Sequence, residues 1–144
     1  MGISQFPLAW RWTDEQYAVL PTEVLAQIAP QAPTQARALF DESLALTGSD
    51  GLNPALFNLT QIATGHPDPS QITAWLLEHC PDTQAQVYLS WQPDTAVFTN
   101  WGIFATFWSE FCYPASDDLI VLPTDRRWVL LYHHSEFMQH GLHR

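Results

Sequence analysis

Imidazole and carboxylate side chains gather near the end of the sequence, and together they form a donor set that zinc and iron sites use. The residues that such a site would use are His133, His134, Glu136 and His140. Their spacing argues against it, because adjacent residues such as His133 and His134 point to opposite faces of a strand. The HExxH, CxxC and EF-hand patterns do not occur. We therefore predict that the protein has no metal site and needs no cofactor.

Nucleophilic catalysis needs a cysteine or serine beside a base, and the sequence offers Cys112 with His133 or His134. Cys112 follows an aromatic helical pattern, where a buried and inert thiol is expected. The GxSxG elbow, the P-loop and the dinucleotide-binding glycine pattern do not occur. Cys80 lies far from Cys112 in the sequence, so we expect free thiols in a reducing compartment, with a single disulfide left open. We predict no catalytic residue.

Aromatic and acidic side chains occur together in the second half of the sequence. Of the seven Trp, eight Phe and four Tyr, many fall between residues 91 and 128. Most of these must be core, but Trp or Tyr beside carboxylates is also typical of a protein-binding surface. The adjacent carboxylates of Asp117 and Asp118 could alternatively act as general acid and base or hold a divalent ion. We predict partner-binding residues at Glu110, Tyr113, Asp117 and Asp118.

The charge balance narrows the choice of partner. Fifteen carboxylates face five arginines, with no lysine, for a formal net charge of -10. Nucleic acid and anionic membranes would be repelled, whereas a basic protein would be attracted. The alternative is that the acidity only keeps the protein in solution. The sequence contains neither a signal-peptide pattern nor an apolar run of membrane-spanning length, so we expect a cytoplasmic protein.

Helical periodicity dominates the first half of the chain, and strand periodicity dominates the second half. Strands are predicted at 85–92 and 95–99 as one hairpin, and at 119–122 and 128–133 as another. Between the hairpins, the spacing of aromatic residues predicts a helix that Asn100 caps and Pro114 ends. Outside the hairpins, a short strand or an extended arm is predicted at 8–12, and helices are predicted at 13–20, 23–29, 34–46, 54–63, 72–80 and 135–140.

These elements predict the α+β class, because strands and helices do not alternate along the chain. Residues 1–144 would form a single globular domain, because this length is common for a chain with one hydrophobic core. We expect a mainly helical N-terminal half packed on a C-terminal antiparallel sheet of two hairpins with an intervening aromatic helix.

The segment from Trp101 to Gly141 carries a resemblance. It has a Trp-rich helix, the sequence Phe111-Cys-Tyr-Pro-Ala-Ser-Asp-Asp118, a strand Trp128-Val-Leu-Leu-Tyr132, and a final Glu136-Phe137. This pattern over residues 101–141 looks like small acidic uncharacterised bacterial proteins of the immunity type, which accompany polymorphic toxins. The resemblance implies stoichiometric binding of a basic toxin by an acidic surface, and no catalytic residues.

The function expected from the sequence is therefore non-enzymatic protein binding, as a bacterial immunity-type inhibitor of a cognate toxin. One alternative is a small metal- or cysteine-dependent enzyme that uses the C-terminal histidines. Another is an oligomeric subunit or adaptor whose aromatic residues form an interface between copies.

Overall fold

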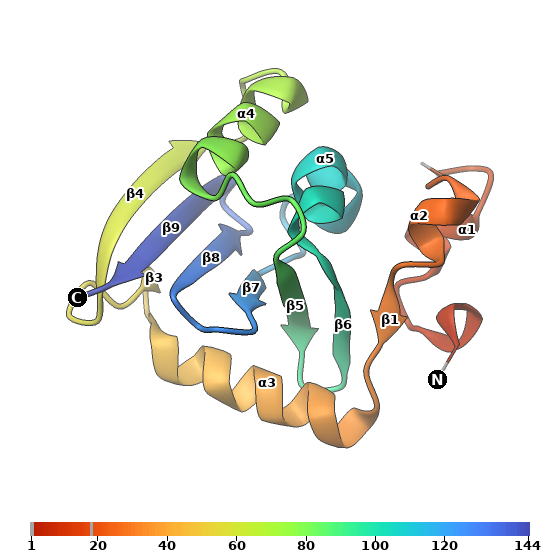
Figure 1. The fold of residues 1–144 in the computed structure, drawn as a ribbon, viewed down its shortest axis with the longest axis horizontal. Coiled ribbons are helices and arrows are strands. Elements are labelled where there is room, and N and C mark those ends of the chain that lie inside the picture. Colours follow the sequence, from red (N-terminus) through yellow and green to blue (C-terminus); the bar gives the residue numbers. More distant parts are fainter. Residues whose placement is uncertain (1, 18) are drawn as a thin grey trace.

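One antiparallel sheet of seven strands organises the protein, and its strand order is β1-β6-β5-β7-β8-β9-β4 (Figure 1). The computed structural model describes residues 2–17 and 19–144. A separate short pair, β2 with β3, follows the longest helix. The strand bounds are β1 (Ala29–Pro30), β2 (Thr47–Gly48), β3 (Gly51–Leu52), β4 (Phe57–Ala63), β5 (Gln86–Gln92), β6 (Thr95–Asn100), β7 (Leu119–Pro123), β8 (Trp128–His133) and β9 (Phe137–His143).

Helices cover both faces of the sheet (Figure 1). One face packs on α3, and the other carries the larger core beneath α1, α4 and α5. Burial on both faces explains why β7 and the first five residues of β8 are almost wholly apolar. The helices are α1 (Trp10–Thr13), α2 (Thr22–Leu25), α3 (Pro33–Leu46), α4 (Pro69–His79) and α5 (Trp101–Phe111), preceded by a 3-10 turn η1 (Ile3–Gln5).

The three long helices begin at recognisable signals. Asp68 accepts the Ser70 N–H at the start of α4, and Asn100 accepts the Ile103 N–H at the start of α5. Helices α3 and α4 each begin with a proline, whose missing N–H is not needed at the first helical position. The helices predicted at 34–46, 72–80 and after Asn100 are therefore confirmed, as are the two hairpins formed by β5 with β6 and β7 with β8.

Tryptophan indole groups donate hydrogen bonds to backbone carbonyls at the ends of two helices. The last carbonyls of α5 accept two indole N–H groups, Trp12 to Glu110 O at 2.9 Å and Trp91 to Phe111 O at 3.0 Å. The carbonyl of Cys80, after α4, accepts the Trp101 indole N–H at 2.7 Å. The last carbonyls of a helix have no partner within it, so each of these bonds satisfies a polar group that would otherwise be buried unpaired. The high tryptophan content is thus largely structural.

The predicted helical N-terminal half is wrong, and so is the sheet of only two hairpins. The segment predicted as a helix at 54–63 contains the strand β4, and the segment predicted as a helix at 135–140 lies largely in β9. The two pair along their full length, from Phe57 opposite His143 to Ala63 opposite Phe137. Gly141 lies within β9 where the Phe57 ring packs: an added Cβ would lie 2.9 Å from Phe57 Cγ.

The start of the chain also differs from the prediction. The alternation at 8–12 predicted a short strand or an extended arm, but Trp10–Thr13 forms α1. The helix was predicted at 13–20, where residue 18 lies outside the described residues; residues 14–17 form a turn in which the Tyr17 N–H donates to Asp14 O. The helix predicted at 23–29 is shortened to α2 and followed by β1, which pairs with β6. None of the helices in the described ranges is long and apolar enough to cross a bilayer.

Candidate functional site

Three aromatic rings meet at the surface where α1 approaches the end of α5. Trp10 and Tyr17 are 41% and 44% exposed, and their ring centroids lie 4.9 Å apart in an edge-on arrangement. Tyr113, half-buried, meets the other side of Trp10 at 5.8 Å, again edge-on. We call Trp10, Tyr17 and Tyr113 the aromatic surface. Large amphipathic rings that stay exposed on a folded protein are typical of binding surfaces.

The geometry of α1 decides which tryptophan is exposed. Positions 10 and 12 lie about 200° apart around a helix, so one side chain must face outward when the other faces inward. Trp12 is fully buried, where its ring stacks on Phe6 and its N–H donates to Glu110 O. Trp10 is consequently left at the surface.

A buried ion pair supports this surface from below. The Arg11 guanidinium donates to both carboxylate oxygens of Asp117, at 2.6 and 3.0 Å, and both residues are buried. Asp117 also accepts the Tyr113 N–H at 2.9 Å, and the guanidinium lies 4.0 Å from the centroid of the Tyr113 ring. The pair therefore fixes Tyr113 through its backbone and through a cation–π contact.

Three acidic residues lie next to the aromatic surface in sequence or in space. Asp14 and Glu15 are exposed in the turn that joins Trp10 to Tyr17, and Glu110 is half-buried. Burial raises the pKa of Glu110, and it also raises the pKa of Tyr113, an effect that Arg11 partly offsets. The surface thus combines rigid rings with an acidic rim, which suits a basic protein partner.

The predicted partner-binding residues separate into two places. Glu110 and Tyr113 belong to the aromatic surface and its rim, and Asp117 lies beneath it, paired with Arg11. Asp118 is exposed, and it lines a cavity on the α3 face of the sheet. Trp10 and Tyr17 were not predicted from the sequence. The two tryptophans of Trp10-Arg11-Trp12 marked this segment as a candidate, but their spacing did not tell which ring would be exposed.

Asp118 forms a second cluster with the histidines that follow β8. Its Oδ1 accepts both the ring Nδ1–H and the backbone N–H of His134, at 2.9 and 3.0 Å. Partial burial acts to raise the pKa of Asp118, but the bonds from His134 and the nearby histidine charges outweigh it, so the pKa is lowered. The ring of His133 stacks on that of His134 at 4.2 Å.

The expectation that His133 and His134 point to opposite faces is wrong, because β8 ends at His133 and His134 lies in the following turn. The other two predicted candidates lie elsewhere. Glu136 is exposed in the turn before β9, and its carbonyl accepts the Thr64 N–H. His140 is buried against His79 and Trp128 in the larger core.

The cluster opens on a cavity of about 400 Å³ between α3 and the sheet. Phe40, Ile120 and Leu131 provide apolar lining, and Ser90 provides a hydroxyl that is 3% exposed. The Ser90 Oγ has no hydrogen-bond partner among the described residues. A buried hydroxyl in this state is the kind of polar group that a ligand or an ordered water satisfies.

Cys112, the predicted alternative nucleophile, is buried. Burial raises the pKa of its thiol well above the ordinary value, and the negative charge of Asp117 adds to the effect. The thiolate form is therefore disfavoured, and this geometry does not favour cysteine-dependent catalysis.

The chain was also compared with known proteins, and no family model, curated protein or solved structure matches it. Any function assigned to it therefore has to be argued from its own residues.

Proposed function

We propose that this protein is a non-enzymatic binding protein of the immunity type, which uses its aromatic surface to hold a basic toxin in the cytoplasm. The observation that supports this most directly is the exposure of Trp10 and Tyr17 beside Tyr113, above a buried ion pair that keeps the surface rigid. Rigid aromatic anchors lose little conformational entropy on binding, so they contribute strongly to affinity.

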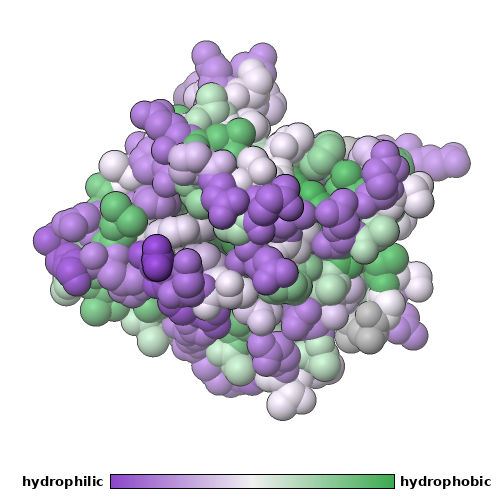
Figure 2. Space-filling model, in the orientation of Figure 1, coloured by the Kyte–Doolittle hydropathy of each residue, from purple (hydrophilic) through white to green (hydrophobic). Residues whose placement is uncertain are grey.

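The charge of the chain supports a basic partner. The net charge of -10 is spread along the sequence, and the rim adds Asp14, Glu15 and Glu110 next to the rings. Figure 2 shows polar side chains over much of the face of Figure 1, with smaller apolar areas between them. Opposite fields accelerate the encounter of two proteins and disfavour wrong partners. Binding should therefore weaken as salt is raised, because rim charges are screened.

The test uses the product of the neighbouring gene as the partner. Titration calorimetry with the purified pair should give a one-to-one complex at micromolar concentration or below. Trp10→Ala and Tyr17→Ala should each weaken binding by about tenfold or more, because each removes an aromatic anchor. Leu142→Ala is the matched control: it truncates an exposed apolar side chain in β9 and should leave affinity unchanged.

Two outcomes would contradict the proposal. One is the absence of any complex at micromolar concentration, and the other is a complex that both aromatic variants form as tightly as the parent. Light scattering of the protein alone tests the oligomer alternative. A dimer that Trp10→Ala dissociates would make the aromatic surface a contact between copies of this chain, in place of a toxin-binding surface.

A further inference from the structure

We propose that Asp118, His133 and His134 form a binding site for a divalent transition-metal ion at the mouth of the cavity beneath α3. These residues supply one carboxylate and two imidazoles, and one ligand atom from each lies within 4.8 Å of the others. Imidazole with carboxylate suits the first-row divalent ions from Fe²⁺ to Zn²⁺. This site is separate from the aromatic surface, and the proposal does not depend on the proposed function.

The antiparallel pairing of β7 with β8 brings these residues together. Leu119 lies opposite Tyr132, so Asp118 and His133, the residues next to that pair, lie side by side at one end of the strands. Residues separated by two positions share a face, so His133 points to the α3 side with Leu131. The turn after β8 then folds His134 back onto Asp118, where two hydrogen bonds hold it.

Hydrogen bonds already bring the ligand atoms of the three residues close together. His134 Nδ1 and Asp118 Oδ1 are 2.9 Å apart. Neighbouring ligands of a tetrahedral ion with bonds of roughly 2.1 Å lie about 3.4 Å apart, so the two atoms would have to separate by only about 0.5 Å to bind one. His133 Nδ1 accepts the Ser135 N–H at 3.1 Å. An ion bound by both Nδ1 atoms would replace the proton of His134 and would release the Ser135 N–H from His133.

The surroundings favour a cation with free coordination positions. The side chains of His134 and Asp118 are 49% and 58% exposed, so an ion can reach them from solvent. No lysine or arginine is among the described residues that line the cavity, and the whole chain carries a charge of -10. Three protein ligands leave at least one position for water or a small oxygen ligand, and the unpartnered Ser90 hydroxyl lines the same cavity.

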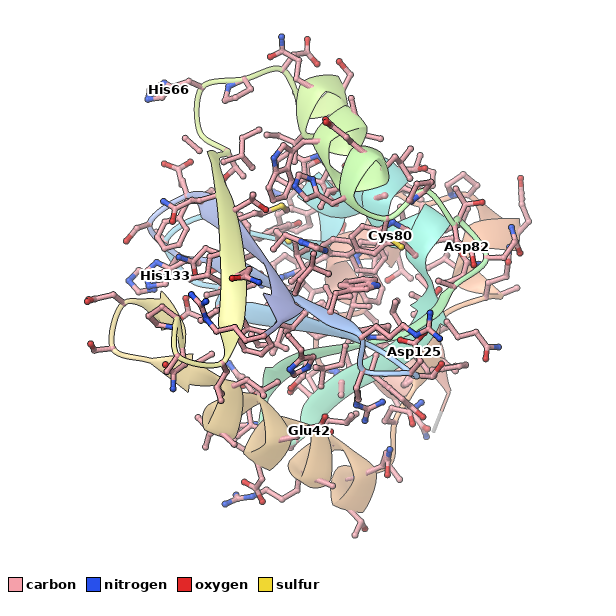
Figure 3. All side chains as sticks on the ribbon, turned by 60° about the vertical axis from the view of Figure 1, so that its left-hand side comes forward. Glu42, His66, Cys80, Asp82, Asp125 and His133 are labelled. Carbon is pink, nitrogen blue, oxygen red and sulfur yellow. The ribbon has the colours of Figure 1, made fainter. Side chains whose placement is uncertain are left out.

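Calorimetric titration of untagged full-length protein with Zn²⁺ tests the site, and Co²⁺ absorption provides a second measurement. The parent protein should bind one ion with micromolar affinity or better. His134→Ala, His133→Ala and Asp118→Asn should each weaken binding by about tenfold or more, since each removes a ligand. His66→Ala is the control: His66 is exposed in the loop before α4, well away from His133 (Figure 3), so its loss should change nothing.

Nuclear magnetic resonance separates this site from adventitious binding. Zn²⁺ should shift the Ser135 amide signal of the parent protein and of His66→Ala, because the ion displaces the bond to His133 Nδ1. Circular dichroism confirms that each variant is folded before it is titrated. The proposal fails if the parent binds no Zn²⁺ at about 100 μM free ion, roughly 100-fold the micromolar dissociation constant expected for the site. It also fails if all three ligand variants bind as tightly as the parent.

Discussion

Arg11 and Asp117 illustrate how one pair of residues decides both stability and the shape of a surface. Both groups are buried and face each other in a two-bonded arrangement. In such a pair, the cost of removing one partner exceeds the net contribution of the pair itself, because a lone charge remains in the interior. Asp117 was predicted as a partner-binding residue, but its carboxylate is paired with Arg11 inside the protein.

Asp117→Ala should lower the free energy of unfolding by about 3–5 kcal/mol, since it leaves the Arg11 guanidinium buried without its carboxylate. The double variant Arg11→Met with Asp117→Ala should lose less than the sum of the two single variants, because no buried charge remains. Urea unfolding of all four proteins measures this coupling. Additive losses would show that the two groups do not interact.

His140 is the residue from which we expect acid sensitivity. The residue is 3% exposed, and its Nε2 has no hydrogen-bond partner among the described residues. Its ring centroid lies 4.8 Å from that of His79. Burial lowers the pKa of His140 from 6.5 to about 4, and the charge of His79 acts in the same direction. The folded protein therefore holds the neutral ring, whereas the unfolded chain takes up a proton at higher pH.

His140 should make the folded protein less stable in acid. Between pH 6.5 and pH 4 the unfolded state binds more protons at this site, so stability falls as the pH is lowered through that window. The loss at pH 4 is on the order of 3 kcal/mol from His140 alone. Thermal unfolding across the window should show it, and His140→Phe should flatten the slope while His66→Ala preserves it. A slope unchanged in His140→Phe would mean that other groups carry the effect.

At the scale of elements, the helices depend on tryptophans from other segments. Trp91 in β5 and Trp12 in α1 donate to consecutive carbonyls at the end of α5, so a strand and a helix that are distant in sequence terminate it together. The aromatic pattern of α5 suggested a core helix, and α5 is indeed largely buried. The acceptors for the indole groups could not be predicted, because they lie on elements whose placement depends on the whole sheet.

Trp91→Phe should lower the free energy of unfolding by about 2–3 kcal/mol, because it leaves the Phe111 carbonyl without its indole donor and also removes buried volume. Trp128→Phe is the matched control, since Trp128 is similarly buried but its indole donates to no described residue. It should lose about 1 kcal/mol less, the difference attributable to the hydrogen bond. If chemical denaturation gave equal losses of unfolding free energy for the two variants, the hydrogen bond from Trp91 to the Phe111 carbonyl would not contribute to stability.

At the scale of the whole molecule, the sheet separates two surfaces with different chemistry. The aromatic surface lies with α1 and α5, whereas the cavity and its histidine–carboxylate cluster lie on the side of α3. Asp117 and Asp118 are neighbours in sequence, yet one supports the aromatic surface and the other belongs to the cluster. A binding function at one surface therefore leaves the other free for a second role.

The sequence by itself determined the elements whose signals are local. It predicted α3, α4 and α5, with the Asn100 cap, and the two hairpins of β5 with β6 and β7 with β8. Periodicity, capping residues and turns are sufficient there, because the residues that define each element are close along the chain.

Only the tertiary structure decided the remaining features. Strands β4 and β9 are far apart in the sequence and pair with each other. This pairing made strands of two segments whose local patterns had predicted helices. The exposure of Trp10, the burial of Asp117 and the meeting of Asp118 with His134 likewise follow from which elements pack together. Local sequence contains no information about such partners, because burial and pairing are properties of surfaces that meet only after folding.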